Sequence, residues 1–163
     1  TATAASTAAA ASTAAAASTA AASAAAGVGD TYELYFDGAC VPNPGVGGAG
    51  AVIYKNSQEI WGDSRFVGTN ETNNTAEYDG LIYGLEEAIR QNIPSIIVKG
   101  DSQLVIKQMR GEYKVKASNL KHLYRTAIKL AKQITVKEYV HVYRNDNERA
   151  DELSNEGLLK KKN

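Results

Sequence analysis

Residues 96–101 read IIVKGD, three consecutive apolar residues followed by a short polar step that ends in an acid. A short run of branched apolar residues with no polar member is typical of a strand buried in the centre of a sheet. Pro94 separates the run from what precedes it, and a helix is expected from Ser102 to about Met109. The stretch therefore predicts a strand–helix unit with Asp101 at the tip of a buried strand.

Upstream of this unit the sequence predicts three strands and one long helix. Tyr32–Asp37 alternates apolar and polar residues, and Gly48–Tyr54 and Ile60–Val67 follow as two further strands that pair as a meander. The Pro-Asn-Pro-Gly turn at 42–45 separates the first two strands. Thr72 and Asn73 are expected to cap a helix that runs to about Gln91.

Downstream we expect a helix from Ser118 or Asn119 to Gln133, a strand at Tyr139–Tyr143 and a terminal helix at 147–159. The whole order is three strands, helix, strand, two helices, strand, helix. Antiparallel strands followed by crossover units predict an α/β fold, with a five-stranded mixed sheet that carries helices on both faces. Active sites in such sheets form at strand ends near a switch in strand order.

The 163 residues carry 18 basic and 18 acidic side chains, all of them after residue 26. The first 26 residues are only Ala, Thr and Ser, which predicts a leader at 1–30 that is flexible or docks on a larger assembly. A targeting remnant is the weaker reading, because such segments usually carry Arg. The domain is expected at 31–159, before a basic tail at 160–163.

Composition also indicates in which environment the protein is expected. No apolar run approaches the roughly 20 residues that span a bilayer, so no membrane partner is expected. The single cysteine, Cys40, excludes an intramolecular disulfide and favours a reducing, intracellular compartment, with cytoplasm, nucleus and organelle left open.

Eight basic residues and one acid lie between Lys107 and Lys132. Within this stretch Lys121, Arg125 and Lys129 are spaced to share one helix face. Such a face is either a solvated surface or one that binds a nucleic-acid backbone, and the sequence leaves both readings open.

Four carboxylates stand in well-formed contexts: Asp37 at the end of the first strand, Glu77 in the first turn of its helix, Asp101 after the buried strand and Asp151 on the terminal helix. Each alone is compatible with a turn or a helix cap. Gathered at one point they could not all stay ionised without a cation among them. Oxygen ligands suit Mg²⁺, and the constellation predicts two-metal phosphoryl chemistry.

The sequence blocks around these acids carry a family resemblance. They are FDGAC at 36–40, NPG at 43–45, GGAG at 47–50, TNNTAE at 72–77, GDSQ at 100–103 and NERADEL at 147–153. In this order they resemble a type 1 ribonuclease H (ribonuclease HI), of the archaeal- and plant-like subgroup without a basic handle. The resemblance covers residues 31–159.

The resemblance implies an endonuclease that hydrolyses the RNA strand of RNA–DNA hybrids and leaves 5′-phosphate and 3′-hydroxyl ends. It implies that Asp37, Glu77, Asp101 and Asp151 bind two Mg²⁺ ions, for which Mn²⁺ is an acceptable substitute. It also implies substrate contacts near the 2′-hydroxyl that distinguishes RNA. The positions that match these contacts are Gly38, Cys40, Asn43, Asn73, Asn74, Gln103 and Asn147.

The chain departs from bacterial members of the family in two places. Their loop histidine before the final helix has no clear counterpart: His141 is expected inside the last strand, in the core or on a sheet face. Arg144 is the better candidate for handling phosphate. The segment 111–117 is too short for a basic handle.

Two other functions stay open at this point. One is a structural or RNA-binding component of a larger assembly, docked through the leader. The other is a different nuclease or recombinase of the same fold, which the motif spacing disfavours.

Overall fold

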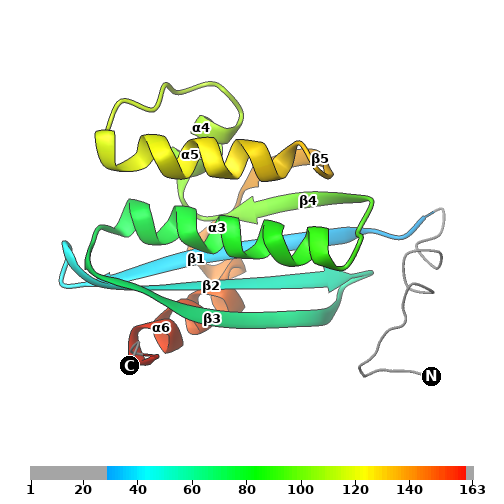
Figure 1. Ribbon diagram of the computed structural model, residues 1–163. Coiled ribbons are helices and arrows are strands. Elements are labelled where there is room, and N and C mark those ends of the chain that lie inside the picture. The colour runs from blue at the N-terminus through cyan, green and yellow to red at the C-terminus, as the bar shows by residue number, and fades with distance from the viewer. Residues whose placement is uncertain (1–28, 161–163) are drawn as a thin grey trace.

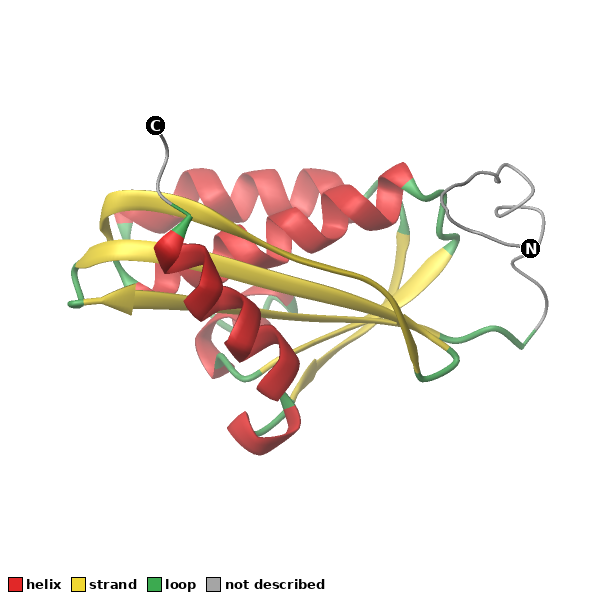
Figure 2. Ribbon diagram, turned by 90° about the horizontal axis from the view of Figure 1, so that it is seen from below, coloured by secondary structure: helices red, strands yellow, loops and turns green. Residues whose placement is uncertain are grey.

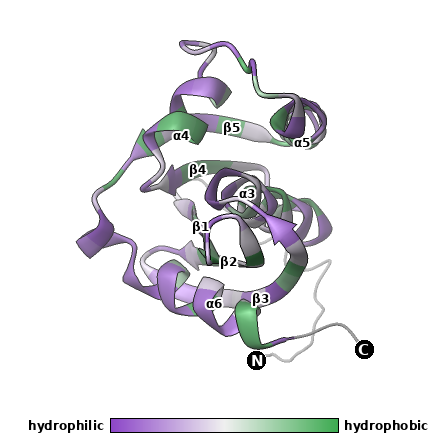
Figure 3. Ribbon diagram, turned by 90° about the vertical axis from the view of Figure 1, so that its left-hand side faces the viewer, coloured by the Kyte–Doolittle hydropathy of each residue, from purple (hydrophilic) through white to green (hydrophobic). Residues whose placement is uncertain are grey.

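The computed structural model describes residues 29–160. The predicted leader and basic tail therefore lie outside the described residues, except for Gly29, Asp30 and Lys160. Five strands form one sheet in the order β3-β2-β1-β4-β5 (Figure 1). Figure 3, which views the molecule from one end, shows the strands following one another in this order from β5 to β3.

The sheet is mixed, as predicted. Neighbouring strands are antiparallel between β1 and β2 and between β2 and β3, and parallel between β1 and β4 and between β4 and β5. The switch from antiparallel to parallel neighbours falls on β1. The strands are β1 (Tyr32–Val41), β2 (Gly45–Lys55), β3 (Gln58–Glu71), β4 (Ser95–Gly100) and β5 (Thr135–His141).

Helices cover both faces of the sheet, as predicted. On one face lie α3 (Asn73–Arg90), α4 (Gln103–Met109) and α5 (Ser118–Ala131), and on the other lies α6 (Glu148–Leu159) (Figure 2). A short 3-10 turn, η1 (Arg144–Asp146), leads into α6. None of the described helices is long and apolar enough to cross a membrane.

The main core lies between the sheet and α3. Leu34 and Phe36 of β1 pack there with Leu81 and Leu85 of α3, and all four side chains are buried. Burying a side chain of this kind stabilises the fold by about 1.5–3 kcal/mol. A smaller cluster under α6 joins Val52, Ala150 and Leu153.

Several strand boundaries were predicted wrongly: β2 begins earlier, at Gly45, β3 extends to Glu71, and the errors in β1 and β5 bear on the site. β1 continues past Asp37 to Val41, because β2 pairs with it residue by residue as far as Val41 opposite Val46. Asp37 therefore lies inside a strand. β5 spans Thr135–His141 and not Tyr139–Tyr143. Its first half includes polar residues that hid the strand pattern, and an edge strand such as β5 tolerates them.

Candidate active site

The structure brings together three of the four predicted carboxylates. Asp37 of β1, Glu77 of α3 and Asp101, which follows β4, each offer an oxygen, and these atoms all lie within 4.8 Å of one another. Because β1 and β4 are parallel neighbours, with Phe36 opposite Gly100, Asp37 in β1 lies beside Asp101, which directly follows β4. Such a set of hard oxygen atoms has the chemistry of a divalent cation site.

Two glycines allow α3 to come close enough to deliver Glu77. A Cβ on Gly38 would lie 2.3 Å from the backbone of both Ala76 and Glu77, and a Cβ on Gly80 would lie 2.4 Å from the carbonyl oxygen of Asp37. Carbon atoms cannot approach so closely. The close packing of β1 on α3 therefore requires glycine at both positions.

The start of α3 is fixed by side-chain caps. Thr72 Oγ1 accepts a hydrogen bond from the backbone N–H of Thr75 at 3.1 Å, and Thr75 Oγ1 accepts one from the N–H of Thr72 at 2.8 Å. Asn43 Oδ1 accepts a hydrogen bond from the N–H of Asn73 at 3.2 Å. Because the helix begins at Asn73, Glu77 lies in its second turn and not in the first as predicted, so Glu77 is not a capping residue.

Burial and mutual repulsion raise the pKa values of these three carboxyl groups. Burial raises the pKa of Asp37, and the neighbouring charges of Asp101 and Glu77 raise it further. Burial also raises the pKa of Glu77 to about 7, although a hydrogen bond from Ser102 opposes the increase. Burial raises the pKa of Asp101, although the positive charge of Arg144 opposes the change. The site therefore favours a bound cation at neutral pH.

The three carboxylates lie in an open cleft of about 760 Å³. The cleft brings most of the predicted site residues to one surface. Those that line it are Asp37, Gly38, Cys40, Asn73, Asn74, Glu77, Asp101, Arg144 and Asp151. Asp151 of α6 is close to Asp37, and the side-chain hydrogen bond between them raises the pKa of Asp37. The fourth carboxylate therefore shares the cleft, beside the compact set of three.

Three predicted substrate residues lie elsewhere. Asn147 does not line the cleft but adjoins it: its side chain is 1% exposed, Nδ2 donates a hydrogen bond to the carbonyl oxygen of Phe36 at 3.0 Å, and the side chain also hydrogen-bonds the carboxylate of Asp101. It ties the start of α6 to β1. Gln103 is exposed at the start of α4 but does not line the cleft. Asn43 lies behind the cleft wall, where it holds the N-terminus of α3.

Cys40 faces the cleft through its backbone. Its side chain is buried, and the thiol lies within hydrogen-bonding distance of the carbonyl oxygens of Pro42 (3.2 Å) and Glu71 (3.1 Å). The thiol is thus occupied by the turn between β1 and β2.

Both candidates for phosphate handling reach the cleft. His141 lies in the last strand, as predicted; it is the final residue of β5, is half-buried and lines the cleft. Strand β5 ends two residues earlier than predicted, and this places His141 at the rim. Arg144 is exposed in η1 and lines the same cleft, as predicted from its place before the final helix.

Five further residues of the cleft were missed, namely Ala39, Val41, Val142, Tyr143 and Asn155. Tyr143 is 76% exposed at the rim, and its ring meets that of His141 edge-on at 5.4 Å. Val41 and Asn155 line the cleft as well. Asn155 could have been found, because it lies one helical turn after Asp151 on the same face. No pattern in the sequence marks Tyr143 or Val41.

The basic face predicted on the helix that begins at Ser118 or Asn119 is present on α5. Lys121, Arg125 and Lys129 are all exposed on α5. The structure leaves this surface free of ion pairs within residues 29–160, since none of the three has a carboxylate partner there. It is available to a polyanion.

Comparison with known proteins gives consistent matches. A family model described as "Reverse transcriptase-like" matches residues 35–157. A relative from Mycobacterium tuberculosis, bifunctional protein Rv2228c, is 39% identical over 123 residues, which are 75% of this chain and 34% of the relative. A ribonuclease H from Pseudomonas syringae pv. syringae is 36% identical over 148 residues, covering 79% of this chain and 93% of the relative. The chain thus spans about a third of the mycobacterial relative.

The fold matches solved structures as well. The crystal structure of LC11-RNase H1 in complex with an RNA/DNA hybrid has a TM-score of 0.73 and 33% identity, over 80% of this chain and 98% of that chain. RNase H1 from Halobacterium salinarum has a TM-score of 0.75 and 36% identity, over 80% and 99%. With the motifs, the mixed sheet and the carboxylate cleft in agreement, the chain belongs to the ribonuclease H family.

Proposed function

We propose that this protein is a metal-dependent endonuclease that hydrolyses the RNA strand of RNA–DNA hybrids and leaves 5′-phosphate and 3′-hydroxyl ends. The observation that carries the proposal is the carboxylate cleft. Oxygens of Asp37, Glu77 and Asp101 lie within 4.8 Å of one another, and Asp151 lines the same cleft. All four acids are present and line one cleft, which favours an enzyme over a structural component of an assembly.

The residues present fit two Mg²⁺ ions, held by Asp37, Glu77, Asp101 and Asp151. The crowded carboxyl groups of Asp37, Glu77 and Asp101 have raised pKa values, so a divalent cation would relieve the repulsion between them. Bound Mg²⁺ would supply a Lewis acid for the phosphate and lower the pKa of a water molecule. Mn²⁺ accepts the same oxygen ligands.

The remaining groups of the cleft would orient the hybrid. Arg144 is exposed and cationic, and it would neutralise a phosphate oxygen beside Asp101. Asn73 and Asn74 present side-chain amides, which can both donate to and accept from a 2′-hydroxyl. The backbone from Gly38 to Cys40 lies along the same wall and offers further hydrogen-bonding groups.

The test is cleavage of an end-labelled RNA–DNA hybrid in Mg²⁺, with RNA duplex and DNA duplex of the same sequence as controls. Only the RNA strand of the hybrid should be cut, and Asp101→Asn should lower the rate by at least about 100-fold, the scale seen when one transition-state contact is removed. Glu156→Gln removes an exposed carboxylate on α6 outside the cleft and should leave the rate unchanged.

A folded protein that cuts no hybrid in Mg²⁺ or Mn²⁺ would overturn the proposal. Cleavage that survives Asp101→Asn unchanged would overturn the assignment of the site. The chemistry of the ends is read by ligating the products, which requires a 5′-phosphate and a 3′-hydroxyl.

A further inference from the structure

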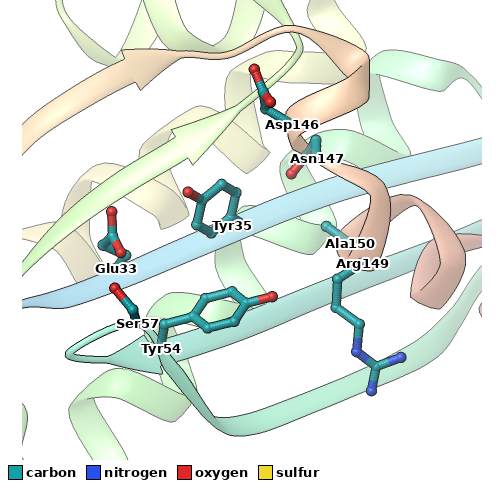
Figure 4. Close-up of a pocket in the computed structure, with 8 residues that line it drawn as sticks. All are labelled: Glu33, Tyr35, Tyr54, Ser57, Asp146, Asn147, Arg149 and Ala150. Carbon is teal, nitrogen blue, oxygen red and sulfur yellow. The ribbon is translucent and has the colours of Figure 1, made fainter.

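A second pocket, of about 230 Å³, lies at the start of α6 and is lined by side chains that do not line the carboxylate cleft. Helix α6 covers only part of its face of the sheet (Figure 2). Beyond its N-terminal end the pocket is walled by Glu33 and Tyr35 of β1, Tyr54 of β2, and Asp146, Asn147 and Arg149 (Figure 4). None of these six residues lines the carboxylate cleft. The pocket is therefore a separate feature of the molecule.

Asn147 gives this pocket a buried acceptor without a partner. Its Nδ2 is used by the carbonyl oxygen of Phe36, so the amide orientation is set, and Oδ1 has no hydrogen bond within residues 29–160. The side chain is 1% exposed, and its oxygen points towards Tyr35 (Figure 4). A buried acceptor left unpaired is costly, so a bound molecule that donates an N–H there would be favoured.

The charges around the pocket are predominantly negative. Glu33 pairs with Lys99 at 2.6 Å, and the guanidinium of Arg149 is shared between Glu59 (3.0 Å) and Glu152 (2.7 Å). The carboxylate of Asp146 has no ion pair in the described part of the chain. The lining itself carries two carboxylates and one guanidinium, and with the ion-pair partners Lys99, Glu59 and Glu152 the count is four carboxylates and two cations. A positively charged ligand is preferred over an anion, even though Arg149 lines the wall.

The aromatic walls suit a cation too. The rings of Tyr35 and Tyr54 meet edge-to-face at 5.5 Å and 82°. The electron-rich face of an aromatic ring attracts ammonium and guanidinium groups. Lys99 already demonstrates this, because its Nζ lies 5.4 Å from the centre of the Tyr35 ring. The N-terminus of α6 opposes a cation, but its first turn carries Glu148 and Asp151, which offset the helix dipole.

We propose that this pocket binds an organic cation with N–H donors, a primary ammonium or a guanidinium group. One N–H would donate to Asn147 Oδ1, the charge would face Asp146 and Glu33, and the carbon chain would lie against Tyr54. The ligand chemistry fits a small free amine, and it also fits the basic side chain of another protein. The pocket adjoins the carboxylate cleft through Asn147, whose side chain also hydrogen-bonds Asp101.

The test is a ¹H–¹⁵N NMR titration of the full chain in excess Mg²⁺, which occupies the catalytic carboxylates. The probes are 1,4-diaminobutane, Nα-acetyl-lysine amide and inorganic phosphate. The side-chain amide of Asn147 and the Nε–H of Arg149 should shift saturably with diaminobutane. Binding by the diamine alone identifies a free amine as the ligand, and equal binding by the blocked lysine identifies a protein side chain.

Two variants and a matched control test whether the cation binds in this pocket. Asp146→Asn should weaken binding about fivefold, as expected for a partly exposed ion pair. Tyr54→Leu should weaken it by a similar factor. Glu156→Gln removes one negative charge, as Asp146→Asn does, but Glu156 lies on α6 outside the pocket. This control should not change binding of the amine. The remaining resonances report whether each variant is folded.

Three results would overturn the proposal. The first is no saturable shift at Asn147 with either amine, which would mean that the pocket holds water only. The second is equal weakening by Asp146→Asn and Glu156→Gln, which would show a nonspecific charge effect. The third is a response of Asn147 to phosphate and not to amines.

Discussion

At the scale of single residues, the carboxyl group of Glu77 shows how the site trades stability for cation binding. Its pKa is raised from 4.5 to about 7, first of all by burial. The unfolded chain loses this proton near pH 4.5, whereas the folded chain keeps it until about pH 7. Stability in the absence of metal should therefore fall as pH rises through this window, because the folded state binds more protons.

This predicts that Glu77→Gln stabilises the metal-free protein at pH 8 by about 1–3 kcal/mol and has little effect at pH 4. The measurement is urea unfolding in a chelator at both pH values. Adding Mg²⁺ at pH 8 should stabilise the unsubstituted protein more than the variant, since a ligand to the ion has been lost. Parallel stability curves from pH 4 to 8 would contradict the prediction.

At the scale of elements, the contact between β1 and α3 is a backbone contact made possible by Gly38. Its Cβ position is filled by the backbone of Ala76 and Glu77 at 2.3 Å, and backbone cannot rotate out of the way. Any side chain here would push the start of α3 from the strand. The displacement would separate Glu77 from Asp37 and open the compact set of carboxylates.

We therefore predict that Gly38→Ala destabilises the protein by about 2 kcal/mol or more and abolishes hybrid cleavage. Chemical unfolding and the cleavage assay measure the two effects. The control is Gly62→Ala in β3, where the nearest atom is the end of the flexible Glu59 side chain at 2.9 Å. Gly62→Ala should leave both quantities nearly unchanged. Equal behaviour of the two variants would refute the argument.

The elements also show what a sequence can and cannot predict. The carboxylates at 37, 77, 101 and 151 were found because acids at the ends of apolar segments stand out, and strand topology gathers them. The bounds of β5, and with them the place of His141 at the end of the strand, were missed because an edge strand need not be apolar. The burial of Asn147 was not predicted, because its type is polar and its burial depends on a contact with Phe36, far away in sequence. Such contacts leave no local pattern.

At the scale of the whole molecule, charge is balanced overall and separated locally. The net charge is zero, yet Lys121, Arg125 and Lys129 stand exposed on one face of α5 while acids fill the cleft. A polyanion would be attracted to the basic face and repelled by the cleft unless metal is bound. Long-range attraction of this kind weakens steeply with salt.

If that face binds the hybrid backbone, replacing all three residues by Gln should weaken binding. It should also lower the magnitude of the slope of log affinity against log salt by up to about 3. Binding is measured at several salt concentrations with Asp101→Asn, which should not cut the hybrid. Arg90→Gln, at the far end of α3 from Asn73, is the control and should change the slope little. An unchanged slope in the triple variant would mark the face as merely solvated.

The bond between Asn147 and Phe36 has a consequence for biosynthesis. It joins residues 111 positions apart, and Asp151 follows Asn147 by one helical turn. A ribosome extends a chain by about 5–20 residues per second, so Asp151 is made on the order of ten seconds after Asp37. A nascent chain therefore carries three of its acids while it still lacks the fourth and the latch that holds α6 to β1. Synthesis itself therefore delays completion of the carboxylate set by this interval.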